Sequence, residues 1–470
     1  MQHRAAFFLL LAACSSSPSG GPDAGPDVEA GTGDVLSIGV PPFTLVPVFS
    51  PMTHDYYVRC AAGDNPATLV VDTTNGETLT PVDLVPDQAL TVANQYWIRC
   101  LPPDFPVLFA TGSLDGGAPT PGYYLVNSLT YAFVLDTNGT PIWYARGSAV
   151  ADVDALAKDT ITFVPNATLP YGYASTVAFS IKALDGPTTT SLLAVGSPTD
   201  LHELRLLPNG DYLLFTYPIE QGVDLTGLST YGANETMADC KIEEVDPAGN
   251  LVWSWLASDH VDPVKESMQP AANMINGQNV IDVFHCNAID VDAAGNLLLS
   301  ARHASALYDI DRTSGVIQWK LGGTAYNKDG AALIAVTGDT EGTFSMQHDA
   351  RFAKTPNHVT MFDDHGAPGA VGVARGVEYA LDFGAKTATV AWQYLGTGKS
   401  QYEGSFRRYA DGHDVIGWGY VPNDPRIVTE VSDDGTDVLD VASSGGASYR
   451  AVKVPLTQLD VNVLRKTCPQ

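Results

Sequence analysis

The sequence repeats one pattern three times, in which a histidine opens an apolar run, a Gly or Asn turn follows, and a second apolar run returns. The copies are HELRLLPNGDYLL from His202, HCNAIDVDAAGNLLL from His285 and HDARFAKTPNHVTMF from His348. Two apolar runs joined by a short turn indicate an antiparallel hairpin. In a radial array of such hairpins, equivalent positions face a common axis. The repeat therefore predicts that three imidazoles meet at one mouth, as a catalytic or metal site requires.

A second repeated phrase also favours a radial array of sheets. Asp, a turn, apolar residues and then Trp occur in LDTNGTPIWY, VDPAGNLVWSW, IDRTSGVIQWKLGG and LDFGAKTATVAWQYLG, which gives corresponding places to Trp143, Trp253, Trp319 and Trp392. A large aromatic residue at the same place in each sheet is expected to pack neighbouring sheets together. With weaker sheets expected around 160–195 and 426–454, the hairpins predict about six blades of four strands. Five or seven blades also fit the hairpin count.

The part of the chain before these repeats has a different pattern. Alternating segments such as TLVVDTT and QALTVANQYWIRC, separated by turns such as Asn75-Gly76, predict short paired strands. The prolines of LPPDFPV end this region, because proline interrupts strand pairing. We therefore predict an all-β chain in which a small N-terminal β-sandwich at 35–104 precedes a six-bladed β-propeller at 105–470.

The first residues predict export. MQHRAAFFLLLAAC contains Arg4 and an apolar run that is shorter than the roughly 20 residues of a membrane-spanning helix. LAAC resembles the lipobox of bacterial lipoproteins, which implies that 1–14 is a signal peptide with lipobox and that Cys14 becomes lipidated. An ordinary signal peptide with a chance cysteine is the alternative. Residues 15–34, rich in Ser, Gly, Pro and Asp, predict a flexible linker. We expect a periplasmic or cell-envelope lipoprotein, anchored at the outer membrane through lipid alone.

Five cysteines remain after Cys14, an odd number for an exported chain. Cys60 and Cys100 lie in the similar contexts YYVRC and YWIRC, and we predict a disulfide between them. A pairing of Cys240 with Cys468 is a further expectation, which no sequence context supports. Cys286 is then left as a free thiol with a packing role.

Charge excludes some partners. The chain has 53 acidic and 25 basic residues and a formal net charge of −28, which would repel nucleic acid and anionic lipid surfaces. Its hydrophobic content of 45% is enough for a large core. We expect small-molecule partners, with no nucleic acid and no membrane contact beyond the lipid anchor; the sequence does not indicate an oligomeric state.

The second histidine segment contains the most polar groups that could bind a ligand. Regular strand alternation would place His285 and Asn287 on one face and Cys286 on the other. Arg302 follows the returning strand and is expected beside the start of the first. A histidine, an amide and a guanidinium together suit an oxyanion such as sulfate, phosphate or carboxylate. A structural ion pair between Arg302 and an Asp is the alternative.

Two segments, FHCNAIDVDAAGNLLLSARHASALYDIDRTSGVIQWKLGG and QHDARFAKTPNHVTMFDDHG, carry specific H-x-N…S-x-R-H and Q-H-D-A-R elements. On these elements the chain resembles the bacterial arylsulfotransferase (aryl-sulfate sulfotransferase) family. DLHELRLLPNGDYLL and GSFRRYADGHDVIGWG resemble it more weakly. The resemblance extends over about 105–454. It implies a six-bladed propeller that moves a sulfuryl group from a phenolic sulfate ester to a phenol through a sulfohistidine, without the nucleotide sulfate donor of cytosolic sulfotransferases.

The resemblance also implies roles for individual residues. His348 would be the nucleophile, His285, Asn287 and Arg302 would hold the sulfuryl oxygens, and His202 would complete the cluster. One of the other histidines could give a proton to the leaving phenolate and take one from the acceptor. No metal and no cofactor are expected. The fourth repeat departs from the pattern, because it has Gly404-Ser405 where the others have histidine.

Other classes of function remain open from the residues alone. Three histidines could hold zinc in a metal-dependent hydrolase or lyase, although a cationic Arg302 beside them argues against a metal ion. IDRTSGVIQW also resembles the repeat of quinoprotein propellers. The propeller could instead be a non-catalytic surface-binding module. Five further histidines are assigned hydrogen-bonded structural roles: His260, His303, His358, His365 and His413.

Overall fold

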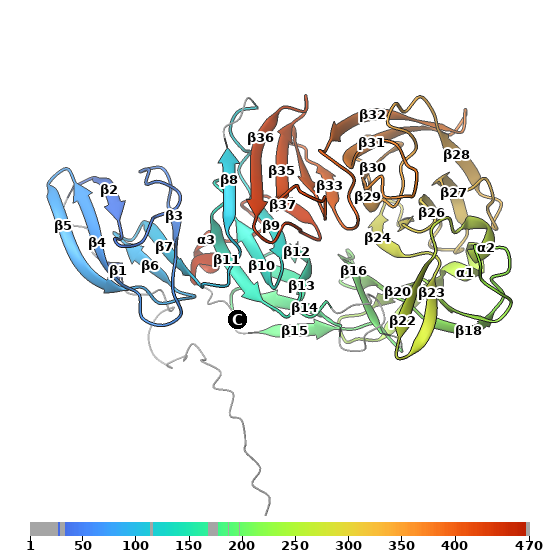
Figure 1. Cartoon of the computed structure of the whole chain (residues 1–470), viewed down its shortest axis with the longest axis horizontal. Coiled ribbons are helices and arrows are strands. Elements are labelled where there is room, and N and C mark those ends of the chain that lie inside the picture. The colour runs from blue at the N-terminus through green and yellow to red at the C-terminus, as the bar shows by residue number, and fades with distance from the viewer. Residues whose placement is uncertain are drawn as a thin grey trace, which may run out of the picture. The chain divides into compact units, whose positions relative to one another are not determined.

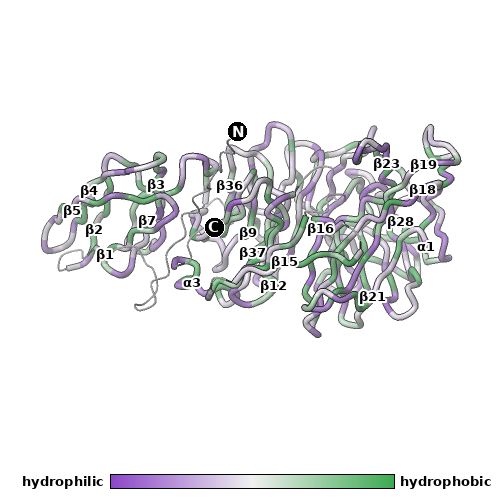
Figure 2. The backbone as a smooth tube through the Cα atoms, turned by 90° about the horizontal axis from the view of Figure 1, so that it is seen from below, coloured by the Kyte–Doolittle hydropathy of each residue, from purple (hydrophilic) through white to green (hydrophobic). Residues whose placement is uncertain are grey.

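The structure is a computed structural model that describes residues 27–28, 33–112, 116–167, 177–186, 188–196 and 198–466. Within these ranges it is almost entirely β-structure, with only three short helices. It forms two compact units: one holds the described residues up to Pro103 together with Arg465 and Lys466, and the other is Asp104–Leu464. Figure 2 shows hydrophobic and hydrophilic stretches alternating along the chain, as expected of strands and their turns.

The N-terminal unit is a β-sandwich, as predicted. One sheet has the order β1 (Asp27–Val28), β6 (Ala89–Val92), β7 (Tyr96–Leu101) and β3 (Asp55–Arg59), and the other has the order β2 (Val35–Gly39), β4 (Pro66–Thr73) and β5 (Gly76–Asp83). Side chains from both sheets, including Val58, Leu69 and Ile98, form one buried core. Alternating apolar residues on each sheet supply this core, which is why the sequence pattern was informative.

The larger unit is a six-bladed propeller, which confirms the predicted fold (Figure 1). Blade one contains, from the inner to the outer strand, β37 (Ala451–Val454), β9 (Tyr123–Ser128), β10 (Tyr131–Leu135) and β11 (Pro141–Arg146). Blade two contains, in the same order, β12 (Ala151–Ala157), β13 (Thr160–Val164), β14 (Phe179–Ala183) and β15 (Thr189–Leu192). Blade three contains β16 (Thr199–Leu206), β17 (Tyr212–Thr216), β20 (Lys241–Val245) and β21 (Leu251–Leu256). Blade four contains β24 (Cys286–Val291), β25 (Leu297–Ala301), β26 (Ala306–Ile310) and β27 (Ile317–Gly322). Blade five contains β29 (His348–Phe352), β30 (His358–Asp363), β31 (Arg375–Asp382) and β32 (Thr387–Leu395). Blade six contains β33 (Ser405–Arg408), β34 (His413–Gly417), β35 (Arg426–Ser432) and β36 (Asp437–Ser443).

Two further strands extend the outer edges of blades. β28 (Ala332–Val336) pairs in parallel with β27 and β32 and so joins blades four and five, and β8 (Leu108–Gly112) pairs with β36. The ring closes because β37, near the C-terminal end of the larger unit, pairs with β9, near the N-terminal end of that unit (Figure 1). The segment 426–454, expected as a weak blade, is therefore divided: β35 and β36 belong to blade six, and β37 belongs to blade one.

The repeated tryptophans pack neighbouring blades together, as predicted. Each lies on the outermost strand of its blade and contacts a side chain of the following blade. The ring of Trp143 lies 6.4 Å from that of Phe163, Trp319 lies 6.1 Å from Phe383, and Trp392 stacks on Phe406 at 5.1 Å. Trp253 instead receives the guanidinium of Arg312 at 5.7 Å.

An insertion interrupts blade three. β18 (Ile219–Val223) and β19 (Glu235–Ala238) leave the blade after β17 and form a sheet with β23 (Gln278–Asp282) and β22 (Ala271–Ile275). The helices α1 (Ala257–His260) and α2 (Pro263–Glu266) precede β22, and α3 (Val461–Lys466) ends the described chain. In the described ranges, no helix combines the length and the apolar character needed to cross a membrane.

The disulfides confirm one prediction and correct another. Cys60 is bonded to Cys100, as predicted. Cys286 is not free: it is bonded to Cys240, whose Cα lies 6.1 Å away. Cys240 directly precedes β20 of blade three and Cys286 opens β24 of blade four, so the stacking of adjacent blades brings together two cysteines that the sequence pattern does not relate. Cys14 and Cys468 lie outside the described residues, as do the lipobox and most of the linker.

Candidate active site

The three repeat histidines lie together. His202 is in β16, His285 directly precedes β24 and His348 opens β29, so they come from the inner strands of three consecutive blades. The rings of His202 and His285 meet edge to face at 4.8 Å. His348 interacts electrostatically with both of these histidines and with Arg302. His202 and His348 are each only 3% exposed, so the cluster is almost closed to bulk water.

The backbone is irregular at the start of the inner strands, and this irregularity sets the direction in which the side chains of His202, His285 and His348 point. β16, β24 and β29 each shift register near their first residues, and His285 has a left-handed φ of 48°. A β-bulge redirects the side chains around it, and bulges are frequent next to active sites. The regular alternation predicted from Phe284 to Asn287 therefore does not describe this segment, because the ladder between β24 and β25 is shifted between Cys286 and Ala288.

Each of the three histidines is held by a carboxylate. Nδ1 of His202 donates to Asp200 at 2.7 Å, and Nδ1 of His285 donates to Asp282 at 2.6 Å. Nδ1 of His348 lies 3.1 Å from the carboxylate of Asp364, which follows β30 in the same blade. A carboxylate on one ring nitrogen fixes the tautomer and the orientation of an imidazole.

The unprotonated ring nitrogen of His348 can be identified from its second contact. The backbone N–H of Glu403 points at Nε2 of His348 at a distance of 3.3 Å. Since a backbone N–H can only donate, Nε2 carries the lone pair and Nδ1 carries the proton that faces Asp364. Burial and the positive charge of Arg302 hold the pKa of His348 well below its ordinary value. His348 is therefore a neutral imidazole with a free base at Nε2.

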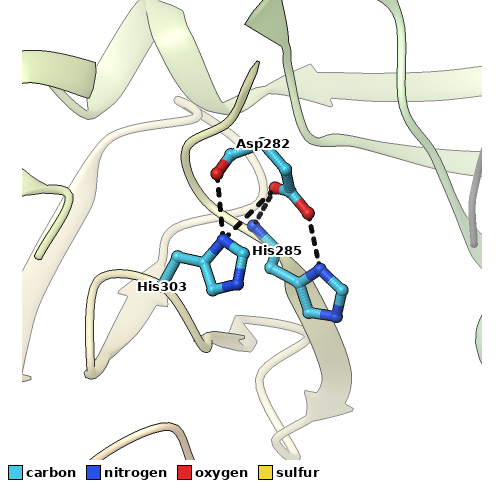
Figure 3. Close-up of side chains that lie close together, drawn as sticks. All are labelled: Asp282, His285 and His303. Atoms are coloured by element: carbon cyan, nitrogen blue, oxygen red, sulfur yellow. Dashed lines mark hydrogen bonds and ion pairs between the residues drawn. The ribbon is translucent and has the colours of Figure 1, made fainter. Parts of the chain in front are cut away.

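His303 and Asp282 extend the cluster (Figure 3). Asp282 contacts both imidazoles, since its carboxylate accepts from His285 and its backbone carbonyl accepts from Nδ1 of His303 at 3.0 Å. The ring of His303 stacks on that of His285 at 4.7 Å. Burial lowers the pKa of His303 to about 3, so this imidazole is neutral as well. The structural role predicted for His303 was incomplete, because the residue lies within the site.

Arg302 and Asn287 provide the polar groups predicted beside the histidines. The backbone N–H of Arg302 donates to the carbonyl of His285, and its guanidinium contacts Nε2 of His303 at 3.2 Å and donates to the carbonyl of Gln401 at 2.9 Å. Nε of Arg302 is buried and has no hydrogen-bond partner among the described residues. Nδ2 of Asn287 donates to the carbonyl of Gln347 at 2.7 Å, which ties the start of β24 to the residue before His348.

A buried network of charged side chains fills the centre of the ring next to Asn287. Arg450 donates to the carbonyl of Asn287 and forms ion pairs with Asp152, Glu203 and Asp349. Arg351 and Arg407 also pair with Asp349, and their positive charges lower the pKa of this carboxyl despite its burial. These residues lie in or beside the inner strands of all the blades, so the network makes the positions of the blades, and of the histidines on them, mutually dependent.

A pocket of about 970 Å³ borders the cluster at Arg302. Its wall combines polar groups with apolar side chains, and the apolar members are Met268, Pro270, Met346, Pro368 and Pro422. The polarisable thioether of methionine makes favourable contacts with aromatic rings. The pocket is large enough for an aromatic ligand of drug-like size.

The residues best placed for a metal ion are Asp282, His285 and His303, whose ligand atoms lie within 4.8 Å of one another (Figure 3). Nδ1 of both histidines already has a partner in Asp282, which is the carboxylate for His285 and the backbone carbonyl for His303. The guanidinium of Arg302 at Nε2 of His303 would repel a cation. The arrangement is therefore better suited to an anion than to a metal ion.

The remaining histidines lie in hydrogen-bonded pairs outside this cluster. Nδ1 of His260, His358 and His413 donates to Asp329, Glu378 and Glu430, and His365 contacts Asp363 and the carbonyl of Glu341. The sequence analysis did not identify the carboxylates Asp200, Asp282 and Asp364. All three lie two to sixteen residues from the histidine they hold, and a search for carboxylates near each repeat histidine would have found at least the first two.

Comparison with known proteins identifies the family. No curated protein matches the sequence. Among solved structures, a protein of unknown function from Bacteroides caccae has a TM-score of 0.42 at 12% identity and covers 71% of this chain and 99% of its own. AztD from Citrobacter koseri has a TM-score of 0.35 at 10% identity, covering 72% and 98%. A catalytically inactive virginiamycin B lyase from Staphylococcus aureus has a TM-score of 0.34 at 8% identity, covering 72% and 99%. These similarities are too low to bear on function. The profile of the arylsulfotransferase (ASST) family matches residues 117–450. This range includes every member of the histidine cluster and all blade strands except the closing strand β37. The chain therefore belongs to the arylsulfotransferase family.

Proposed function

We propose that this arylsulfotransferase moves a sulfuryl group from a phenolic sulfate ester to a phenol through a covalent intermediate on His348. The observation that carries the proposal is the contact set of His348: Asp364 on Nδ1 and an unprotonated Nε2 that faces Glu403 N–H, with Arg302 acting on the ring electrostatically. A neutral imidazole with one nitrogen held by a carboxylate is an activated nucleophile.

In the first half-reaction, Nε2 of His348 attacks the sulfur of an aryl sulfate. The S–N bond forms as the S–O bond to the aryl group breaks, and the electron pair leaves on the aryl oxygen as a phenolate. The imidazole ring gains positive charge in this step, and the carboxylate of Asp364 stabilises that charge at Nδ1. In the second half-reaction a phenol oxygen attacks the same sulfur, the S–N bond breaks, and neutral His348 is restored.

The sulfuryl oxygens need donors at the position where charge spreads in the transition state. Arg302 supplies a cation, and its Nε has no hydrogen-bond partner in the described part of the chain. The backbone N–H of Glu403, 3.3 Å from Nε2, is placed to donate to a sulfuryl oxygen once sulfur is bonded to that nitrogen. The second amide N–H of Asn287 is a further donor of the predicted set. His285 has its single N–H on Asp282, so it contributes packing rather than a hydrogen bond, and His202 packs against its ring.

The pocket beside Arg302 supplies the place for the aryl groups. Its methionines and prolines offer apolar surface to a ring, and Arg302 marks the end at which the sulfate ester is held. Donor and acceptor bind in turn to the same surface, because a covalent intermediate needs only one aryl site. We therefore expect ping-pong kinetics.

The decisive experiment is incubation of purified protein with 4-nitrophenyl sulfate in the presence and absence of phenol. Nitrophenol release that depends on phenol, together with formation of phenyl sulfate, establishes transfer. Release that is independent of phenol would instead indicate hydrolysis. In quenched samples with donor alone, mass spectrometry should find an acid-labile sulfuryl adduct on the peptide that contains His348.

Substitutions assign the roles. His348→Ala should abolish both half-reactions, whereas Arg302→Ala should slow transfer by roughly 10²–10³-fold through weaker transition-state stabilisation. His285→Ala should also slow transfer, because the His285 ring packs against those of His202 and His303. His413→Ala is the matched control, since His413 also pairs with a carboxylate but lies outside the cluster. Normal turnover by His348→Ala would overturn the proposed intermediate.

We also propose that the enzyme acts in the bacterial cell envelope, tethered by lipid on Cys14. The lipobox-like LAAC and the polar residues that follow support this location. Cys14→Ser should move the protein out of the membrane fraction or leave its precursor unprocessed. Unchanged fractionation would count against the anchor.

A further inference from the structure

One inner strand beside the cluster does not contribute a histidine to it. At the start of β33 the histidine repeat is replaced by Gly404-Ser405, and the residue directly before them, Glu403, reaches the cluster instead. The sequence repeat does not predict a role for Glu403. The position of Glu403 beside His348, the proposed nucleophile, points to a role in the reaction.

Glu403 lies directly against His348. Its backbone N–H is 3.3 Å from Nε2, and the carboxyl group interacts electrostatically with His202 and Asp364. The residue is partly buried, and within the described residues its side chain makes no hydrogen bond and no ion pair. A partly exposed carboxyl group without a protein partner beside this cluster is available to a bound ligand.

The backbone holds Glu403 in this place at a conformational cost. Its φ is 67°, in the left-handed region that is uncommon for residues other than glycine. Gly404 follows with a φ of 113°, and a Cβ there would clash with the ring of Phe362. A Cβ on Gly419 would meet the carbonyl of Glu403 at 2.5 Å. Two glycines and one strained residue thus fix the approach of Glu403 to His348.

Both half-reactions need a proton to move at the aryl oxygen. A phenol has a pKa of about 10 in water, so an unactivated phenolate is a poor leaving group and a neutral phenol is a weak nucleophile. His285 and His303 are ill suited to this task, since burial holds the pKa of His285 well below its ordinary value and lowers that of His303 to about 3. Burial raises the pKa of Glu403 to about 7, so both of its protonation states are present near neutrality.

We infer that the carboxyl group of Glu403 is the general acid and base for sulfuryl transfer at His348. In the donor half-reaction the protonated carboxyl gives its proton to the aryl oxygen as the S–O bond breaks, which leaves a free phenol and a carboxylate. In the acceptor half-reaction the carboxylate takes the proton from the incoming phenol as its oxygen bonds to sulfur and the S–N bond breaks. One proton is thus released and recovered in each cycle. This inference rests on the proposed function.

Leaving-group dependence tests the inference, with Glu403→Gln as the variant. Glutamine keeps the size of the side chain and the backbone N–H but cannot exchange a proton. Transfer from phenyl sulfate, whose leaving group needs protonation, should slow by roughly 10²–10⁴-fold. Formation of the sulfuryl enzyme from 4-nitrophenyl sulfate should change little, because the nitrophenolate leaves without a proton. The plot of log rate against leaving-group pKa should therefore become steeper in the variant.

Glu77→Gln is the matched control, since Glu77 is exposed on β5 of the N-terminal unit. It should reproduce the wild-type slope. A solvent isotope effect on phenyl sulfate turnover should be present in wild type and absent in Glu403→Gln. If formation of the sulfuryl enzyme slows equally with both donors in the variant, or if the slope stays as in wild type, Glu403 is not the proton-transfer group. If wild-type protein itself moves no sulfuryl group, the proposed function fails instead.

Discussion

Sγ of Cys286 is bonded to Sγ of Cys240, so the residue directly after His285 is covalently tied to the preceding blade. The bond closes a loop across a sequence separation of 46 residues, which by chain entropy stabilises the folded state by about 4 kcal/mol. It also restrains the irregular backbone on which His285 depends. The disulfide therefore serves the geometry of the site as well as the stability of the propeller.

The double variant Cys240→Ala with Cys286→Ala should lower the free energy of unfolding of the propeller by about 4 kcal/mol and slow sulfuryl transfer. Denaturant unfolding and steady-state kinetics measure the two effects. Cys60→Ala with Cys100→Ala is the matched control, because that disulfide spans a similar separation of 40 residues in the other unit. The control should lose stability but keep its transfer rate. Equal rates for both double variants would show that the Cys240–Cys286 bond does not position His285.

Asp364→Asn should reduce the rate of sulfuryl-enzyme formation by roughly 10²–10³-fold, because an amide cannot stabilise positive charge on the ring of His348 as a carboxylate does. Stopped-flow measurement of nitrophenol release in the first turnover reports this step. Asp329→Asn is the matched control, since Asp329 holds His260 at 2.8 Å outside the site. A wild-type rate for Asp364→Asn would mean that Asp364 does not assist the nucleophile.

The donor half-reaction should persist at acidic pH. Neutral His348 is the reactive form, and burial together with Arg302 keeps its pKa well below the ordinary value of 6.5. Since the folded-state pKa is lowered, protonation that would inactivate the nucleophile begins only at a pH well below that value. Protonation of His348 should thus not lower the first-turnover rate with 4-nitrophenyl sulfate between about pH 8 and about pH 5.5. Burial raises the pKa of Asp364 well above its ordinary value, so a decline that is altered in Asp364→Asn would belong to that carboxyl group. A decline with a midpoint near the ordinary histidine pKa of 6.5 that persists in Asp364→Asn would contradict a lowered pKa of His348.

Removal of metal ions should leave transfer unchanged. In metal sites a histidine ligand is also commonly held by a carboxylate, as His202 is held by Asp200. The geometry of these pairs alone therefore does not distinguish sulfuryl transfer from metal-dependent hydrolysis. The cation Arg302, in contact with His303, favours an anionic ligand. Activity after exhaustive dialysis against a chelator, measured beside an untreated sample, tests this. Loss that one particular divalent metal restores would favour the metal-dependent hydrolase.

The fold was predictable because its signals are periodic. The repeat histidines mark the inner strands of three consecutive blades. The repeated tryptophans mark the outer strands of four blades: Trp143, Trp253, Trp319 and Trp392. The division of 426–454 between two blades was not predictable in the same way. Ring closure by β37 is a pairing between distant segments, and no local pattern distinguishes it from a hairpin within one blade.

The site was predictable in part. The repeat indicated His202, His285 and His348, strand alternation and chemistry indicated Asn287 and Arg302, and the family resemblance implied the role of each residue. Glu403 was not found because it interrupts the repeat, and its contact with His348 depends on a left-handed backbone that the sequence does not signal. His303 was assigned away from the cluster because strand alternation does not describe a bulged strand start.

The closing strand has a consequence for biosynthesis. Tyr449 and Arg450, just before β37, hold the carbonyls of His202 and Asn287 through the Tyr449 hydroxyl and the Arg450 guanidinium. All five residues predicted for the site have been synthesised long before these two leave the ribosome. A nascent or truncated chain thus contains the complete set of reactive side chains without the supports that align them. The order of synthesis should delay sulfuryl chemistry until the ring is complete, so that incomplete chains do not become sulfated on histidine.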